Sequence, residues 1–136
     1  MRGQLINAND IPAVERGSGI ITIPLFGGWN GAAATATGMT IFPPGAGIVM
    51  HSHNVEETVT VLYGNGTATI DGEELPVSKY SVSNVPAGVP HRFVNTGDTE
   101  MRILWVYGGT YITRTITETG VTVEHLSEAD RTGSVG

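Results

Sequence analysis

The feature that most constrains the fold is a series of short segments in which apolar and polar residues alternate, with turn residues roughly every 8–12 positions. Glycine, with 19 residues, and threonine, with 17, are abundant, and β-branched residues favour strands. We expect strands at 20–26, 33–42, 48–53, 57–63, 67–70, 74–77, 81–85, 91–95 and 100–107, and a further hairpin at 111–126. The pattern predicts an all-β sandwich or barrel without a substantial helix.

The chain has 136 residues, which is enough for one domain spanning 1–136 and too few for two. We expect residues 1–18 to form an N-terminal arm and residues 127–136 a flexible tail. No composition shift or repeat in the sequence indicates a boundary between two domains.

Charge and cysteine content exclude several classes of function. The seven Lys and Arg residues are scattered in a chain of net charge −6, whereas binding to a phosphate backbone needs clustered basic residues. No apolar run approaches the roughly 18 residues that span a bilayer, and no signal-peptide pattern is evident, so we expect a cytoplasmic location. Cysteine is absent, which excludes disulfides and thiol catalysis.

Two of the four histidines occur as His51-Ser52-His53. Residues two positions apart on a strand face the same side, roughly 6–7 Å from each other, so both imidazoles can reach one metal ion. Glu57 opens the next expected strand, and His91 opens another after a turn rich in Pro and Gly. Three imidazoles and one carboxylate suit a divalent transition metal. We therefore expect a metal site of His51, His53, Glu57 and His91.

The spacing of these residues resembles the two motifs of the cupin superfamily. The first motif is matched without a gap from Gly45 to Gly64, and most of the second from Pro86 to Asn95. The resemblance covers residues 45–95, the core metal-binding motifs, with flanking strands as expected for a small single-domain cupin. It implies a double-stranded β-helix, a jelly-roll-like barrel, with the metal inside its mouth. It also implies a homodimer formed by exchange of strands or tails.

One position departs from the family pattern. The second motif of the family begins with Gly, and Tyr80 stands at this place, followed by Ser81. We expect either a remodelled turn or a backbone conformation at Tyr80 that is uncommon for a residue with a side chain. The shape of the loop at residues 78–82 is therefore open.

Strand alternation also predicts which side chains face the barrel interior. Counting from the expected ligands and along the later strand in steps of two gives the candidate pocket residues Val49, Tyr63, Phe93, Trp105 and Tyr107. Inward aromatic residues either fill the core of a small barrel or line a pocket above a metal. Phe93 is the best pocket candidate because it lies two residues from His91. His125 has no partner nearby in the sequence, so we interpret it as a surface residue.

Any catalysis should depend on the metal ion, because no Ser-His-Asp pattern and no phosphate-binding loop is evident. The resemblance makes a dioxygenase-type enzyme on a small apolar or aromatic oxygenated molecule the leading hypothesis. The alternatives are a redox-neutral lyase, isomerase or cyclase, and a non-catalytic ligand-binding cupin. The ligand set suits iron, manganese, nickel, copper and zinc alike. Protonation of the imidazoles should release the metal as the pH falls through about 6.

Overall fold

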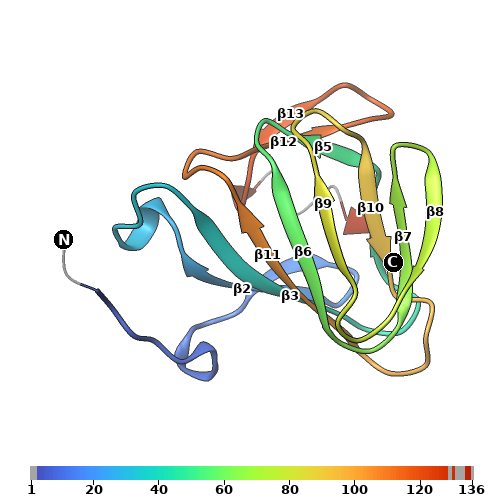
Figure 1. Cartoon of the computed structure of the whole chain (residues 1–136), viewed down its shortest axis with the longest axis horizontal. Helices are drawn as coiled ribbons and strands as arrows, with labels where there is room; N and C mark the ends of the chain where they lie inside the picture. Colours follow the sequence, from blue (N-terminus) through green and yellow to red (C-terminus); the bar gives the residue numbers. More distant parts are fainter. Residues whose placement is uncertain (1–2, 129, 131–133, 136) are drawn as a thin grey trace.

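Two antiparallel β-sheets face each other and form a barrel (Figure 1). The computed structural model describes residues 3–128, 130 and 134–135. The strands of the first sheet, in spatial order, are β1 (Val14–Gly17), β2 (Ile20–Phe26), β3 (Ala36–Phe42), β11 (Met101–Tyr107), β6 (Glu57–Tyr63) and β9 (Val82–Val85). The all-β fold with two antiparallel sheets, predicted from the sequence as a sandwich or barrel, is confirmed.

The second sheet carries most of the residues of the predicted metal site. Its order is β13 (Thr122–Glu124), β12 (Thr113–Ile116), β5 (His51–His53), β10 (His91–Val94), β4 (Gly47–Ile48) and β14 (Ser134–Val135). In addition, β7 (Gly66–Ile70) pairs with β10, and β8 (Glu73–Val77) pairs with β7. Two short 3-10 helices, η1 (Ala8–Asp10) and η2 (Gly28–Asn30), lie before and after β2.

The hydrophobic core lies between the sheets. The neighbouring strands β3, β11 and β6 each alternate buried residues with more exposed ones, as expected for strands with one face on a core. The buried core residues are Ile20, Ala36, Phe42, Ala46, Val59, Val61, Ala68, Phe93, Met101, Ile103, Trp105, Tyr107 and Ile112. The two-residue period seen in the sequence therefore corresponds to burial in these strands.

The chain ends are more attached to the barrel than the sequence suggested. In the expected N-terminal arm, residues 14–17 form β1 and pair with β2. In the expected tail, β14 pairs with β4 and Asp130 is buried. Residues 129, 131–133 and 136 of that segment lie outside the described residues.

At Tyr80, where the sequence departs from the cupin pattern, the backbone adopts an uncommon conformation. Tyr80 has a φ of 74°, in the left-handed region that glycine adopts most easily. Its backbone N–H donates to the carbonyl oxygen of Val61 at 2.8 Å, and its side chain is 71% exposed. The uncommon conformation expected at this position is confirmed.

Replacing Tyr80 by glycine should stabilise the protein. A side chain in the left-handed region costs about 1–2 kcal/mol, and the greater freedom of glycine in the unfolded chain offsets part of this. We expect a net gain of about 0.5–1 kcal/mol, or a rise in Tm of about 2–5 °C, measured by thermal unfolding. Tyr111→Gly is the matched control, because Tyr111 is also exposed but has no positive φ, and it should lower Tm. Equal effects of the two substitutions would contradict the argument from strain.

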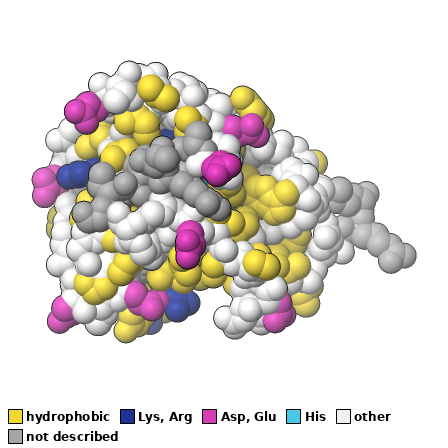
Figure 2. Space-filling view, turned by 180° about the vertical axis from the view of Figure 1, so that it is seen from behind, with side chains coloured by type: hydrophobic (Ala, Val, Ile, Leu, Met, Phe, Trp, Pro, Cys, Tyr) yellow, Lys and Arg dark blue, Asp and Glu magenta, His cyan; other side chains and the backbone are white. Residues whose placement is uncertain are grey.

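The surface has no concentrated basic region on the face drawn in Figure 2. There the Asp and Glu side chains are scattered, and the few Lys and Arg side chains stand apart from one another. Among the described residues, no helix has the length and apolar character needed to cross a membrane.

Candidate metal centre

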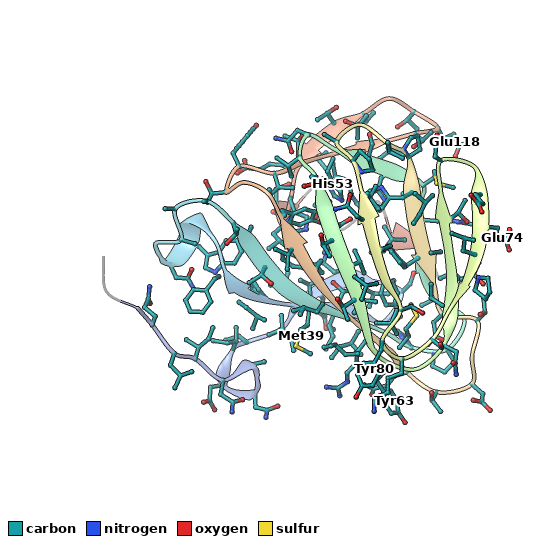
Figure 3. All side chains as sticks on the ribbon, in the orientation of Figure 1. Met39, His53, Tyr63, Glu74, Tyr80 and Glu118 are labelled. Atoms are coloured by element: carbon teal, nitrogen blue, oxygen red, sulfur yellow. The ribbon has the colours of Figure 1, made fainter. Side chains whose placement is uncertain are left out.

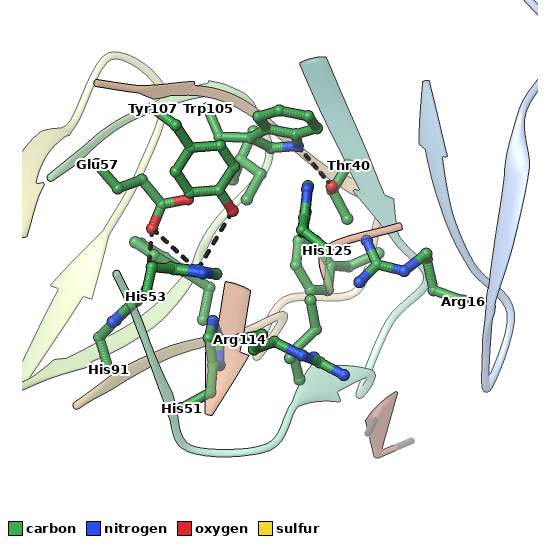
Figure 4. A pocket seen from close by; sticks show the side chains of 14 residues that line it. Arg16, Thr40, His51, His53, Glu57, His91, Trp105, Tyr107, Arg114 and His125 are labelled. Carbon is green, nitrogen blue, oxygen red and sulfur yellow. Dashed lines mark hydrogen bonds and ion pairs between the residues drawn. The ribbon is translucent and has the colours of Figure 1, made fainter. Parts of the chain in front are cut away.

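The three histidines of the predicted site converge inside the barrel (Figure 4). His51 and His53 lie on the same face of β5, and His91 is paired directly with His51 in the register of β5 and β10. All three are buried, and their potential ligand atoms lie within 4.8 Å of one another. The prediction that these imidazoles come together is confirmed.

Backbone carbonyl groups fix the orientation of each imidazole. The Nδ1 atoms lie 2.7 Å (His51 to Val49), 3.0 Å (His53 to Thr113) and 2.9 Å (His91 to Val89) from carbonyl oxygens. A carbonyl oxygen only accepts a hydrogen bond, so each Nδ1 carries a proton, and a neutral ring in this tautomer keeps a lone pair on Nε2. Hydrogen bonds of this kind hold metal-binding histidines in the required tautomer.

Glu57 reaches the same centre from the opposite sheet. Its Oε1 lies 2.9 Å from Nε2 of His91 and 3.9 Å from Nε2 of His53. A carboxylate oxygen and an unprotonated Nε2 are both acceptors, so a proton or a cation between them is needed to satisfy the contact. Burial raises the pKa of Glu57, but its hydrogen bond with His91 and the neighbouring imidazoles outweigh this effect and leave the pKa below its ordinary value.

Three rings form an aromatic wall beside the imidazoles: Trp105, Tyr107 and His125 (Figure 4). The hydroxyl group of Tyr107 lies 3.2 Å from Nε2 of His53, and the centroid of the His125 ring is 5.1 Å from those of Trp105 and Tyr107. Gly38, paired with Trp105, leaves space for the indole, because a Cβ there would lie 2.3 Å from it. The aromatic wall therefore borders the metal centre closely.

The interpretation of His125 as a surface residue is wrong. The hairpin of β12 and β13 attaches to β5, and the backbone N–H of His125 donates to the carbonyl oxygen of Ile112 at 2.9 Å. Burial, together with the charge of Arg16, lowers the pKa of His125 well below its ordinary value, so the ring is neutral at pH 7. The sequence showed that Val123 and His125 are two positions apart and so face the same side of a strand. It did not show the pairing of this hairpin with the metal-binding strand.

A buried Arg–Asp–Arg cluster, formed by Arg16, Asp130 and Arg114, lies beside the site. Oδ2 of Asp130 is 2.6 Å from Nη2 of Arg16, and Oδ1 is 2.6 Å from Nε of Arg114. Arg114 pairs with His53 in the register of β12 and β5, so both side chains face the interior. Sequence reasoning missed this cluster, because Arg16 and Asp130 are 114 positions apart and no motif links them.

The cavity between these groups is small and adjoins a larger apolar cavity. Its volume is about 30 Å³, room for about two water molecules, and the predicted residues Phe93, Trp105 and Tyr107 are in its lining. The neighbouring cavity, of about 310 Å³, lies among apolar residues such as Val61 and Leu75. Phe93 lines both cavities, so its ring separates the metal centre from the apolar space.

Two expected pocket residues, Tyr63 and Val49, are absent from the described lining of this cavity. The β6–β11 pairing contains a bulge that places Tyr63 opposite Arg102, and Tyr63 is 49% exposed, at the other end of the barrel from His53 (Figure 3). Residues 49–50 separate β4 from β5, and Ile48 lines the cavity in place of Val49. Counting in steps of two fails here because a bulge or a break shifts the parity of a strand.

Acid should destabilise the metal-free protein. Burial lowers the pKa values of His51, His53 and His125 in the folded state. Below the unfolded value of about 6.5, the unfolded chain therefore binds more protons, and each histidine reduces the free energy of unfolding by up to about 1.4 kcal/mol per pH unit. The free energy of unfolding continues to fall with pH until the pH drops below the pKa values that these histidines have in the folded protein.

The measurement is urea denaturation of EDTA-treated protein at pH 7.5, 6.5 and 5.5. We expect little change between pH 7.5 and 6.5 and a fall approaching about 4 kcal/mol per pH unit below 6.5. A constant free energy of unfolding down to pH 5.5 would contradict burial of neutral histidines.

The donor set fits a divalent transition metal. Neutral imidazoles are good ligands for such ions, and the contacts of Nδ1 with backbone carbonyls leave Nε2 of each ring as the ligand atom. The three ligand atoms are close enough together for small side-chain adjustments to bring them onto one ion. His51, His53 and His91 together could therefore hold a metal.

Comparison with known proteins gives a consistent family assignment. The family model described as "Cupin domain" matches residues 38–107, which include the three histidines and Glu57. The chain is 33% identical over 107 residues to a protein named polyketide synthase CurC from Streptomyces cyaneus, covering 77% of this chain and 69% of that protein.

Solved structures show the same fold. The polyketide cyclase RemF from Streptomyces resistomycificus has a TM-score of 0.72 and 20% identity, covering 96% of this chain and 90% of that one. A sugar phosphate isomerase of the cupin superfamily from Silicibacter pomeroyi has a TM-score of 0.70 and 19% identity, covering 93% and 98%. With its matched sequence region, barrel and histidine cluster, the chain belongs to the cupin domain family.

Proposed function

We propose that this protein is an enzyme that uses one divalent metal ion for redox-neutral chemistry, of the cyclase, lyase or isomerase type, on a small oxygenated molecule. The observation that carries the proposal is the convergence of three oriented imidazoles and one carboxylate in a buried cavity. Two groups that can exchange protons, Tyr107 and His125, border the same cavity.

Glu57 is the fourth protein ligand in this proposal. Its Oε1 lies 2.9 Å from Nε2 of His91 and 3.9 Å from Nε2 of His53, so the carboxylate and these two imidazoles could contact the same ion. The bound metal would supply a Lewis acid that polarises a carbonyl or enol oxygen.

The protein's own residues handle protons and exclude water. Burial raises the pKa of Tyr107 well above its ordinary value, so its hydroxyl group stays protonated and can donate a hydrogen bond to a substrate oxygen. His125 is neutral at pH 7 and can accept a proton. Phe93 and Trp105 leave little room for water beside these groups.

The relatives support redox-neutral chemistry. The 33% identical protein is named a polyketide synthase, and a polyketide cyclase and a sugar phosphate isomerase share the fold. Cyclisation and isomerisation both require a polarised carbonyl group and a transferred proton. These are the functions that the donor set and the two proton-exchanging residues suit.

Dioxygenase-type oxidation is the second candidate. The same donor set suits iron, manganese and copper, and the metal centre adjoins an apolar space. A substrate for this reaction would be an apolar or aromatic oxygenated molecule.

Metal replacement and oxygen exclusion should separate the candidates. We expect the zinc-loaded protein to convert a member of a panel of 1,3-dicarbonyl compounds without oxygen, and Tyr107→Phe to lower kcat by about 10²-fold or more. The measurements are product formation under anaerobic conditions and oxygen uptake in air. Turnover restricted to the iron or copper form, with oxygen consumed, would replace the proposal by a dioxygenase. Binding of the panel with no turnover in any metal form would indicate a ligand-binding protein.

The homodimer and the cytoplasmic location stay predictions. Relatives in the family act on small molecules, and the proposed substrate is accordingly a small molecule.

A further inference from the structure

A divalent metal would leave uncompensated positive charge around the metal cavity. The Arg–Asp–Arg cluster places two buried guanidinium groups against one buried carboxylate, Asp130. Glu57, the acidic residue in the described cavity lining, is in contact with imidazoles. Tyr107 and His125 carry no charge at pH 7. The two guanidinium groups and the two carboxylates therefore balance before any metal binds, and a divalent metal would leave two positive charges in excess.

Arg114 also has an unused hydrogen-bond donor. Its side chain is 1% exposed, its Nε forms the ion pair with Oδ1 of Asp130, and its Nη2 donates to the backbone carbonyl of Asp130 at 2.5 Å. Among the described residues, Nη1 has no hydrogen-bond partner. Buried donors are nearly always satisfied, so this atom indicates an acceptor other than the described residues.

The position of Arg114 is suited to a ligand of the metal centre. It is paired with His53 in the strand register, lines the same cavity, and lies between His51 and Arg16 in Figure 4. The guanidinium group is planar and matches the two oxygen atoms of a carboxylate. The cavity of about 30 Å³ admits an end group of this size but not the body of a larger molecule.

We propose that Arg114 and the adjoining metal centre form a carboxylate-binding site, so that the substrate carries a carboxylate group at the end that enters the cavity. This inference rests on the proposed function, because it names the substrate class of that site. Arg16 supports it by sharing Asp130, which leaves Arg114 incompletely neutralised.

If Arg114 had a purely structural role, the expected effects of replacing it would be different. The Arg–Asp–Arg cluster holds the chain near residue 130, since Oδ2 of Asp130 also accepts from the backbone N–H of Leu126 at 2.9 Å. In that role Arg114 would affect stability but not the affinity for anions. Arg114→Met separates the two roles, because it leaves Arg16 and Asp130 as a balanced pair and preserves much of the buried volume.

The experiment measures acetate and acetamide binding to the zinc-loaded protein by calorimetry at pH 7 and constant ionic strength. We expect acetate to bind at least tenfold more tightly than its neutral analogue. Arg114→Met should weaken acetate binding at least tenfold while zinc stays at one per chain. Arg102→Met is the matched control, because Arg102 pairs with Glu100 at the surface, and it should leave acetate binding unchanged. Equal acetate affinity of wild type and Arg114→Met would overturn the inference.

A second measurement needs no variant to be well folded. The side-chain Nε–H resonance of Arg114 in the wild-type protein, assigned through the backbone resonances of the same residue, should shift on addition of acetate but not of sodium chloride. An unchanged resonance would overturn the inference. Recording the acetate-induced shift in the metal-free protein as well tests the anion site independently of metal binding. Absence of zinc binding would remove the metal centre, and absence of the acetate-induced shift would remove the carboxylate site.

Discussion

Replacing His51 by alanine should abolish stable metal binding without unfolding the barrel. In the proposed site, four ligands that together contribute about 10–16 kcal/mol would supply roughly 3–4 kcal/mol each, so losing one would weaken binding several hundredfold. His51 is central to the cluster, because it is paired with His91 and shares a strand face with His53. The measurement is the metal content of the purified variant by elemental analysis, with circular dichroism to check the fold.

The matched control is His125→Gln, which changes the remaining histidine of the chain. The ring of His125 lies in the aromatic wall, with its centroid 6.1 Å from that of His53, and it is not part of the three-histidine cluster. This variant should keep one metal per chain. Metal retained by His51→Ala, or lost equally by both variants, would show that the ligand assignment is wrong.

Asp130→Asn should be the most destabilising single substitution outside the metal site. Asp130 is fully buried and neutralises Arg16 and Arg114 at distances of 2.6 Å. Breaking a buried ion pair by removing one partner costs about 3–5 kcal/mol, and here two cations lose the same anion. This is a large share of the stability of a small domain, so urea denaturation should show a strongly lowered midpoint.

Two variants make this prediction specific. Glu100→Gln removes the same charge from a partly exposed pair with Arg102 and should cost no more than about 1 kcal/mol. Adding Arg114→Met to Asp130→Asn removes one uncompensated cation and should restore part of the lost stability. A double variant less stable than Asp130→Asn alone would contradict charge imbalance as the cause.

Much of the fold could be predicted because alternation and turn chemistry act locally. Strands β2 and β6 begin and end where the sequence indicated, since each is bounded by turn residues. The prediction was less accurate at Tyr63 and Val49, where a bulge and a strand break reverse the facing of a side chain. Such irregularities depend on the partner strand, which a single sequence does not reveal.

The candidate site divides in the same way. His51, His53 and His91 could be predicted because their spacing is regular and matches a family motif. His125 and Asp130 could not, because His125 reaches the cavity, and Asp130 reaches the two arginines beside it, through contacts between the C-terminal segment and distant elements. No periodicity within that segment indicates which strand it joins.

The sequence by itself determined the two-residue period, the turns and the histidine spacing, because these depend on residues close together in the chain. Only the tertiary structure decided what surrounds the metal centre. There Tyr107 and His125 border the imidazoles, and two arginines share one aspartate. These groups meet because antiparallel pairing fixes which residues lie opposite one another across large sequence separations, as Arg114 lies opposite His53.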